Sequence, residues 1–255
     1  MSDFNRGYSR TVPTDRADMS VDAGLRSFML GVYNKVALGL VVSAALAFVT
    51  GQVEPVRQLL FRVTTDPVTR EAFYAGYTPL GWIVAFGPLA VMLFSAFAMK
   101  NASPRSSGII YWTVVALIGA SLGAITMMYT GASIASTFLI TATAFGGLSL
   151  IGYTTKKDLT AFGSFLIVGL WGIFIASIVN IFLMNSMMNF IISVLGVLIF
   201  AGLIAYDTQR LKMTYYDLGG NQTAMGVATN YGALSLYLDF INLFMFLLRL
   251  FGDRR

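Results

Sequence analysis

The sequence predicts an all-α membrane protein, a bundle of seven transmembrane helices, and three observations support that prediction. Of its 255 residues, 56% are hydrophobic and only 11% are charged. Soluble domains carry about 25% charged residues, so this chain has too little charge to cover a water-exposed surface. In addition, seven stretches are each long and apolar enough to cross a bilayer, for which a helix needs about 20 residues.

The seven predicted spans follow one another with short connections, except after the first and the sixth. They are residues 28–50, 79–99, 108–128, 132–152, 161–184, 188–209 and 230–252. Small residues recur within them, among them Gly119, Gly123 and the pair Gly146–Gly147. Small residues let helices approach closely in lipid, so we expect these positions to be packing surfaces.

Residues 1–25 are polar and mixed in charge, and they lack the apolar segment and cleavage site of a signal peptide. We expect them to form a flexible tail in the cytoplasm, ahead of a single transmembrane domain at 26–255. Basic residues are found in this tail and in the connections at 100–107, 154–160 and 210–229. The positive-inside rule assigns these connections to the cytoplasm.

An odd number of spans then leaves the C-terminus outside. Arg249, Arg254 and Arg255 argue against that position. Either the last helix is an exception to the rule, or it does not cross completely. The sequence leaves this conflict open.

Composition also excludes several kinds of chemistry. The chain has no Cys and no His, which removes disulfides, the usual transition-metal ligands and the usual titrating group near neutral pH. It has no glycine-rich phosphate loop, and its net charge of +5 is modest. We therefore expect no enzyme activity, no cofactor and no nucleic-acid partner, and any response to pH must come from carboxylates.

Four charged residues lie inside the predicted spans: Lys35, Asp207, Asp239 and Arg249. Lys35 and Arg249 have long side chains that can reach the membrane interface. Aspartate is too short for that, and an ionised aspartate within a bilayer costs at least about 2.5–3.5 kcal/mol. Because the last two spans are consecutive and antiparallel, the economical solution is that Asp207 and Asp239 meet.

Two carboxylates in contact share a proton, and their titration belongs to the pair. Desolvation and like charge move proton release toward neutral pH. Once deprotonated, the pair offers hard oxygen ligands of the kind that Ca²⁺ prefers. The alternatives are a purely structural shared-proton bond and an Asp207 that only caps a helix end near water.

At these residues the sequence resembles the Bax inhibitor-1, or transmembrane Bax-inhibitor-motif, family, and its bacterial inner-membrane members most. The resemblance covers about residue 25 to the end. It rests on GLIAYDTQRLK, ALSLYLDFINLFMFLLRLFG, VYNKVALGL, SIVNIFL and TGASIASTFLITATAFGGLSLIGYTTKKDLT.

The resemblance implies seven helices with the last in the centre, and a pH-sensitive Ca²⁺ leak channel in the inner membrane. It implies that Asp207 and Asp239 are the pH sensor and gate. A basic latch residue at the end of the second helix corresponds to Lys100, in SAFAMKNAS. Lysine lacks the bidentate geometry of arginine, which weakens such a latch. Some members also carry an acidic residue inside the second helix, and residues 79–99 contain none.

Three other functions remain open. Some bacterial relatives look like modulators of a membrane-bound AAA protease, with the N-terminal tail as the recognition segment. A proton-coupled exchanger would use the same carboxylates. An intramembrane aspartyl protease also pairs two aspartates, but it has glycines beside the second one, whereas Asp239 follows the bulky Leu236, Tyr237 and Leu238.

Overall fold

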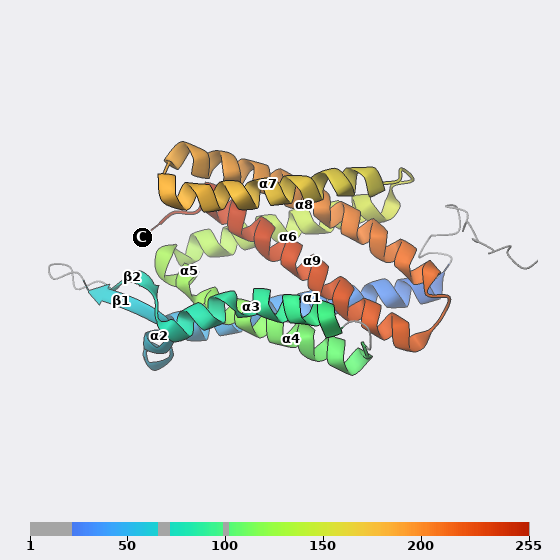
Figure 1. Ribbon diagram of the computed structural model, residues 1–255, viewed down its shortest axis with the longest axis horizontal. Coiled ribbons are helices and arrows are strands. Elements are labelled where there is room, and N and C mark those ends of the chain that lie inside the picture. Colours follow the sequence, from blue (N-terminus) through green and yellow to red (C-terminus); the bar gives the residue numbers. More distant parts are fainter. Residues whose placement is uncertain (1–21, 66–71, 99–101, 255) are drawn as a thin grey trace, which may run out of the picture.

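The computed structural model describes residues 22–65, 72–98 and 102–254, and it shows a bundle of helices with a small two-stranded sheet at one end (Figure 1). In chain order the elements are α1 (Ala23–Gln52), α2 (Glu54–Leu60), β1 (Phe61–Thr65), β2 (Ala72–Tyr77), α3 (Pro79–Ala98), α4 (Pro104–Ser121), α5 (Gly123–Met128), α6 (Gly131–Thr154), α7 (Thr160–Leu183), α8 (Ser186–Asp217) and α9 (Gln222–Phe251).

Among the described residues, six segments are long and apolar enough to cross a membrane: α1, α4 with α5, α6, α7, α8 and α9. The chain is therefore a helical membrane protein. The predicted second span corresponds to α3, whose apolar part, Pro79–Ser95, is shorter than the other six. The predicted third span is divided at Leu122, where Thr50 of α1 donates a hydrogen bond of 3.0 Å to the Ala120 carbonyl.

Polar side chains set the starts of several helices. Asp22 accepts hydrogen bonds from the amides of Gly24 and Leu25 at the start of α1. Ser103 and Ser106 form a reciprocal capping box at the start of α4. Such caps satisfy amides that have no partner within the helix. The predicted tail lies outside the described residues except for Asp22 and the first turn of α1.

The predicted connection at 210–229 is wrong. Helix α8 continues to Asp217 and α9 begins at Gln222, so only a short turn separates them. Gly219 and Gly220 occupy positive φ in this turn, at 56° and 84°, which glycine adopts without strain. The apolar stretch ends near residue 209, but Arg210, Leu211, Lys212 and Met213 are good helix formers, and α8 continues beyond the apolar zone to Asp217.

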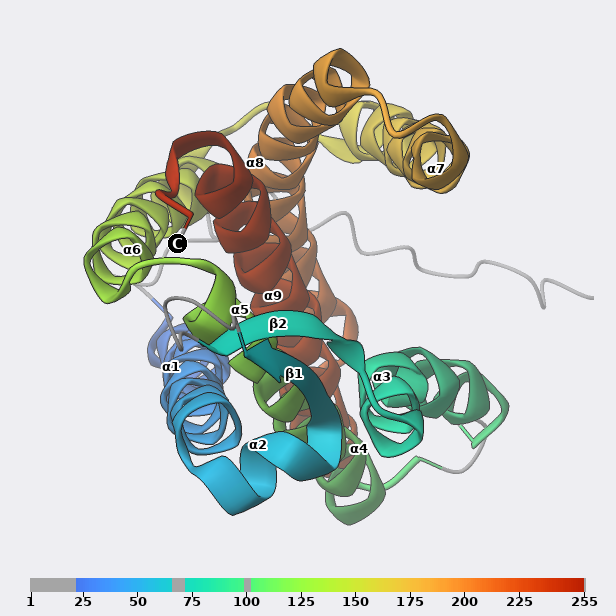
Figure 2. The same ribbon diagram turned by 90° about the vertical axis from the view of Figure 1, so that its left-hand side faces the viewer.

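Helix α9 packs against α1, α4, α6 and α8 (Figure 2). Of its apolar stretch, 56% is buried inside the protein, against at most 39% in the other candidate spans. Tyr237 of α9 shows how this contact is made, because its hydroxyl lies 2.6 Å from Ser43 Oγ of α1. By contrast, α7 packs mainly against α8 at the periphery (Figure 2).

Glycine allows two other helix contacts, between α6 and α8 and between α1 and α4, to be especially close. A Cβ at Gly152 of α6 would lie 2.1 Å from the Ala205 carbonyl oxygen of α8, and one at Gly119 of α4 would lie 2.7 Å from Ser43 Cα. The prediction that these glycines mark packing surfaces between helices was therefore correct for Gly119. It was wrong for Gly146 and Gly147, beside which a Cβ would meet no described atom within 4 Å.

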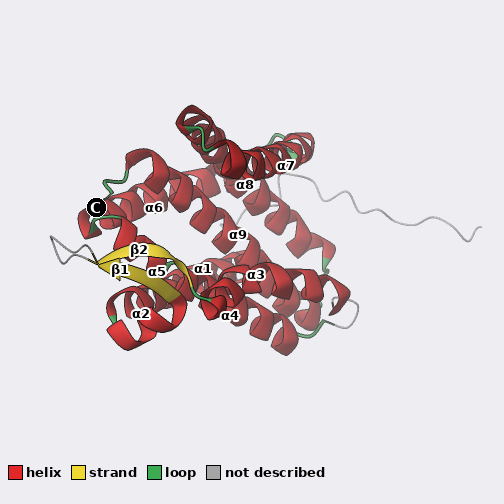
Figure 3. Ribbon diagram, turned by 60° about the vertical axis from the view of Figure 1, so that its left-hand side comes forward, coloured by secondary structure: helices red, strands yellow, loops and turns green. Residues whose placement is uncertain are grey.

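A β-hairpin after α2 was not predicted. Strands β1 and β2 pair antiparallel, with a bulge between Arg62 and Val63 (Figure 3). The rings of Phe61, Tyr74 and Tyr77 pack on one another. This cluster, extended by Trp82 of α3, attaches the hairpin to the end of the bundle.

Lys and Arg residues are found at both ends of the bundle, but more of the described ones lie at one end than at the other. We call one the basic end, because it holds most of the described Lys and Arg residues: Arg26, Arg105, Lys156, Lys157, Arg210 and Lys212. Contacts between distant segments define it: Gln209 Nε2 donates to the Lys157 carbonyl at 2.8 Å, and Asn230 Nδ2 donates to the Pro104 carbonyl at 2.9 Å.

The C-terminal segment lies at the opposite end. The Thr130 amide donates to the Asp253 carbonyl at 3.1 Å, and the Asp253 amide donates to Ser133 Oγ at 2.9 Å. Figure 1 shows the C-terminus beside α5 and the start of α6. Helix α9 therefore runs through the full length of the bundle, whereas the side of the membrane on which the C-terminus lies stays a prediction.

Candidate functional site

Asp207 and Asp239 lie on facing helices, α8 and α9, and both are buried, with 5% and 6% of their surfaces exposed. The short turn between these helices holds them antiparallel over much of their length. Asp239 interacts electrostatically with Asp207 and with Arg210. The structure thus brings together the two aspartates that the sequence singled out.

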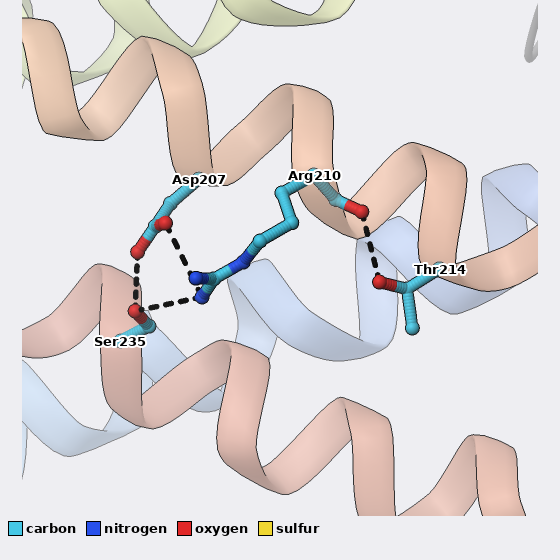
Figure 4. A network of polar contacts seen from close by, with 4 residues as sticks. All are labelled: Asp207, Arg210, Thr214 and Ser235. Carbon is cyan, nitrogen blue, oxygen red and sulfur yellow. Dashed lines mark hydrogen bonds and ion pairs between the residues drawn. The ribbon is translucent and has the colours of Figure 1, made fainter. Parts of the chain in front are cut away.

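Asp207 is held by two neighbours. Its Oδ1 forms an ion pair of 3.2 Å with Arg210, one turn along α8, and its Oδ2 accepts a short hydrogen bond from Ser235 of α9. The Arg210 guanidinium also donates to Ser235 Oγ at 3.4 Å, which closes a triangle across the α8–α9 contact (Figure 4). We call Asp207, Arg210, Ser235 and Asp239 the carboxylate cluster.

Asp239 has fewer hydrogen-bond partners for its carboxylate oxygens than Asp207 has. It lies one turn after Ser235, so the two side chains share a face of α9. Its Oδ2 is fully buried and has no hydrogen-bond partner among the described residues. Buried polar atoms usually have partners, and an exception calls for an explanation such as a function, a water or an ion.

Arg210, like Ser235, is a site residue that sequence reasoning missed. It was assigned to a connection, and only the continuation of α8 brings it onto the same face as Asp207. Tyr206 stacks on its other side, with the ring centre 5.7 Å from the guanidinium carbon. The pattern Asp-Thr-Gln-Arg carried the signal, because residues three apart are neighbours on a helix. Lys100, the predicted latch, lies outside the described residues.

The carboxylate cluster can supply oxygen ligands, but few of them. Ca²⁺ takes six to eight oxygen ligands in typical sites. No group of three or more Asp, Glu, His or Cys residues gathers within 22–65, 72–98 and 102–254. Two carboxylates alone are fewer ligands than a tight Ca²⁺ site needs, and Asp239 Oδ2 is a buried oxygen without a hydrogen-bond partner among the described residues.

An apolar cavity begins beside the cluster on the side away from the basic end. It has a volume of about 580 Å³ and lies between α1, α5, α6 and α9. Phe240, Ile241 and Phe244, which follow Asp239 on α9, line it. Ser43, Gln52 and Thr126 are its polar lining residues. The rest of its lining is apolar.

These features define a class: a polytopic helical membrane protein with a buried carboxylate pair between its last two helices. Comparison with known proteins identifies the family. The family described as "Inhibitor of apoptosis-promoting Bax1" matches residues 25–255, and the chain belongs to this Bax inhibitor family.

Its relatives are bacterial proteins of similar length. A protein of Caulobacter vibrioides is 65% identical over 255 residues, which is the whole of both chains. RP147 of Rickettsia prowazekii is 40% identical and covers 97% of this chain and 98% of its own. The inner membrane protein YbhL of Escherichia coli K12 is 39% identical and covers 91% of this chain and 94% of its own.

Proposed function

We propose that the protein is a pH-sensitive Ca²⁺ leak channel of the inner membrane, with its N-terminus in the cytoplasm and its gate at Asp207 and Asp239. One observation carries the proposal. Two carboxylates are buried together between α8 and α9, and one of their oxygens lacks a partner among the described residues. Buried acidic groups within a membrane protein mark ion or proton pathways by default.

Charge balance explains why this cluster would respond to protons. If both aspartates are ionised, Arg210 leaves one negative charge uncompensated. One proton makes the cluster neutral, and a neutral cluster is favoured in a medium of low polarity. Losing that proton places two anions side by side across the α8–α9 contact, and their repulsion acts to separate the helices.

The inner-membrane location rests on YbhL, which is described as an inner membrane protein. The orientation rests on the basic end, which the positive-inside rule assigns to the cytoplasm. If α3 is counted as an additional span, the bundle has seven transmembrane segments, of which α9 is one. At about 1.5 Å per residue, the 20 residues of α3 extend about 30 Å, enough for the hydrocarbon core.

Ca²⁺ would be the cargo of this pathway. We assign this conformation to a closed state of the proposed channel, because both carboxylates are nearly inaccessible and the adjoining cavity is apolar. Opening requires α8 and α9 to separate, or α9 to shift relative to α1 and α6. Arg210 acts as the latch in this proposal, because it pairs with Asp207 on its own helix α8 and donates a hydrogen bond to Ser235 on α9.

The direct test is Ca²⁺ efflux from proteoliposomes that contain the purified full chain and a Ca²⁺ dye. We expect a leak above that of protein-free vesicles, and a rate that changes across pH 5–8. A leak equal to that of protein-free vesicles at every pH would refute the proposal. Flux that requires an imposed pH gradient would identify an exchanger instead.

A further inference from the structure

A second pocket lies at the basic end, apart from the apolar cavity beside α1. It has a volume of about 400 Å³ and lies between the α6–α7 connection and the last turns of α8. Four cationic side chains line it against a single carboxylate, Asp158: Lys156, Lys157, Arg210 and Lys212. We call it the basic pocket.

Hydrogen bonds from Lys212 and Gln209 give the basic pocket a defined shape. Lys212 has only 9% of its surface exposed, and its ammonium donates to the Tyr153 carbonyl at 2.9 Å and lies over the Tyr153 ring. Gln209 joins its two walls: it accepts from the Leu159 amide and donates to the Lys157 carbonyl, each at 2.8 Å. A buried lysine held in place this way concentrates positive charge in a defined cavity.

Helix α7 adds to this charge. It begins at Thr160, on the wall of the pocket, and Leu159 gives it no side-chain cap. The N-terminus of a helix attracts anions through its free amides and dipole. Asp158 already accepts the Thr160 amide at this helix end, and hydrogen bonds from the side chain and backbone of Thr160 lower its pKa.

The surroundings indicate where the anion comes from. The lipid-facing surface of α7 begins directly next to the pocket, with Phe162 and Phe165 exposed by 46% and 69%. Met213, also exposed, lines the pocket itself. The basic pocket thus places cations next to exposed apolar side chains, and this arrangement matches a lipid that has a charged headgroup and acyl chains. Basic pockets between transmembrane helices at a cytoplasmic surface bind anionic headgroups.

We infer that the basic pocket binds the phosphate group of an anionic phospholipid of the surrounding leaflet. Lys156, Lys157 and Lys212 contact the phosphate, and the start of α7 contributes its amides. Asp158 competes with the phosphate for the same helix end.

Arg210 lines this pocket and also pairs with Asp207. A bound phosphate would draw its guanidinium away from the carboxylate cluster. This consequence for gating rests on the proposed function, whereas the binding itself does not, and the test below measures binding alone.

The experiment is native mass spectrometry of the full chain in detergent, titrated with phosphatidylglycerol or phosphatidylcholine. The pocket variant is Lys156→Gln with Lys157→Gln. Its matched control is Arg26→Gln with Arg105→Gln, which removes two exposed charges at the same end but outside the pocket. We expect phosphatidylglycerol affinity to fall about thirtyfold in the pocket variant, because two charge contacts are lost, and less than threefold in the control.

A second variant, Asp158→Asn, should raise phosphatidylglycerol affinity. Equal losses in the pocket variant and its control, or equal binding of the two lipids by the unmodified chain, would overturn the inference. Inorganic phosphate distinguishes the source of the anion. If 10 mM phosphate leaves phosphatidylglycerol bound, the lipid is the ligand; if it displaces the lipid completely, the pocket serves a soluble phosphate and the assignment to lipid is wrong.

Discussion

At the scale of single residues, the charge of the proposed gate depends on what surrounds Asp239. Burial of Asp239 without a partner for Oδ2 would cost several kcal/mol if it carried a full uncompensated charge. Arg210 and Asp207 determine how much of that charge is compensated. The sequence identified both aspartates, since they are the only acidic residues in the apolar stretches. It did not identify Arg210 or Ser235, whose roles depend on helical register and on the facing helix.

Replacing Arg210 tests its role as the latch. Arg210→Gln removes the positive charge that favours ionised carboxylates in the cluster, so the cluster should hold its proton to higher pH. We expect the midpoint of the pH profile of Ca²⁺ leak to rise by roughly one unit or more. The control is Arg105→Gln, at the same end but outside the cluster. A midpoint that stays in place, or falls, would show that Arg210 does not act on the carboxylates.

At the scale of elements, hydropathy predicted the apolar helices well but not their ends. It located each predicted span on a helix, yet it cut α8 and α9 short by about two turns each, because helices continue where membrane burial stops. The hairpin was missed for a different reason. Its strands are short, and the β-branched and aromatic residues of Phe61–Thr65 lie in a segment that hydropathy describes only as amphipathic.

Close packing between elements gives a stability prediction on α6. Gly152→Ala places a methyl group against the Ala205 carbonyl, so α6 and α8 must move apart. We expect a loss of about 1–3 kcal/mol of unfolding free energy, measured as a lower midpoint of thermal unfolding in detergent.

The matched control is Gly147→Ala, five residues earlier on the same helix, where the added methyl group meets no described atom. Alanine favours helix over glycine, so this midpoint should stay the same or rise. Equal destabilisation by the two changes would contradict the packing described for α6 and α8.

At the scale of the whole molecule, the structure bears on a conflict that charge counting left open. Arg249 and Arg254 argued against an outside C-terminus, yet α9 crosses the bundle and Asp253 pairs with the start of α6. Arg254 lies over the Tyr129 ring and Arg249 over the Phe246 ring. These arginines therefore have local partners at that end, and such contacts are not visible in a count of loop charges.

The absence of native cysteine makes this topology simple to test. Single Asp217→Cys and Arg254→Cys variants place a thiol at exposed positions on opposite ends of the bundle. With a membrane-impermeant maleimide, Arg254→Cys should label in intact spheroplasts and Asp217→Cys only after permeabilisation. Labelling of both variants from the same side would contradict a complete crossing by α9.

The central claim is that protonation of the Asp207–Asp239 pair sets the leak. The most direct measurement is Ca²⁺ efflux against pH, from 5 to 8, for the unmodified chain and for Asp207→Asn with Asp239→Asn. Asparagine keeps the shape but cannot ionise in this range. The account predicts a pH-dependent leak in the unmodified chain and in an Asp217→Asn control, and a flat profile in the double variant. A double variant that keeps the original pH dependence would contradict it.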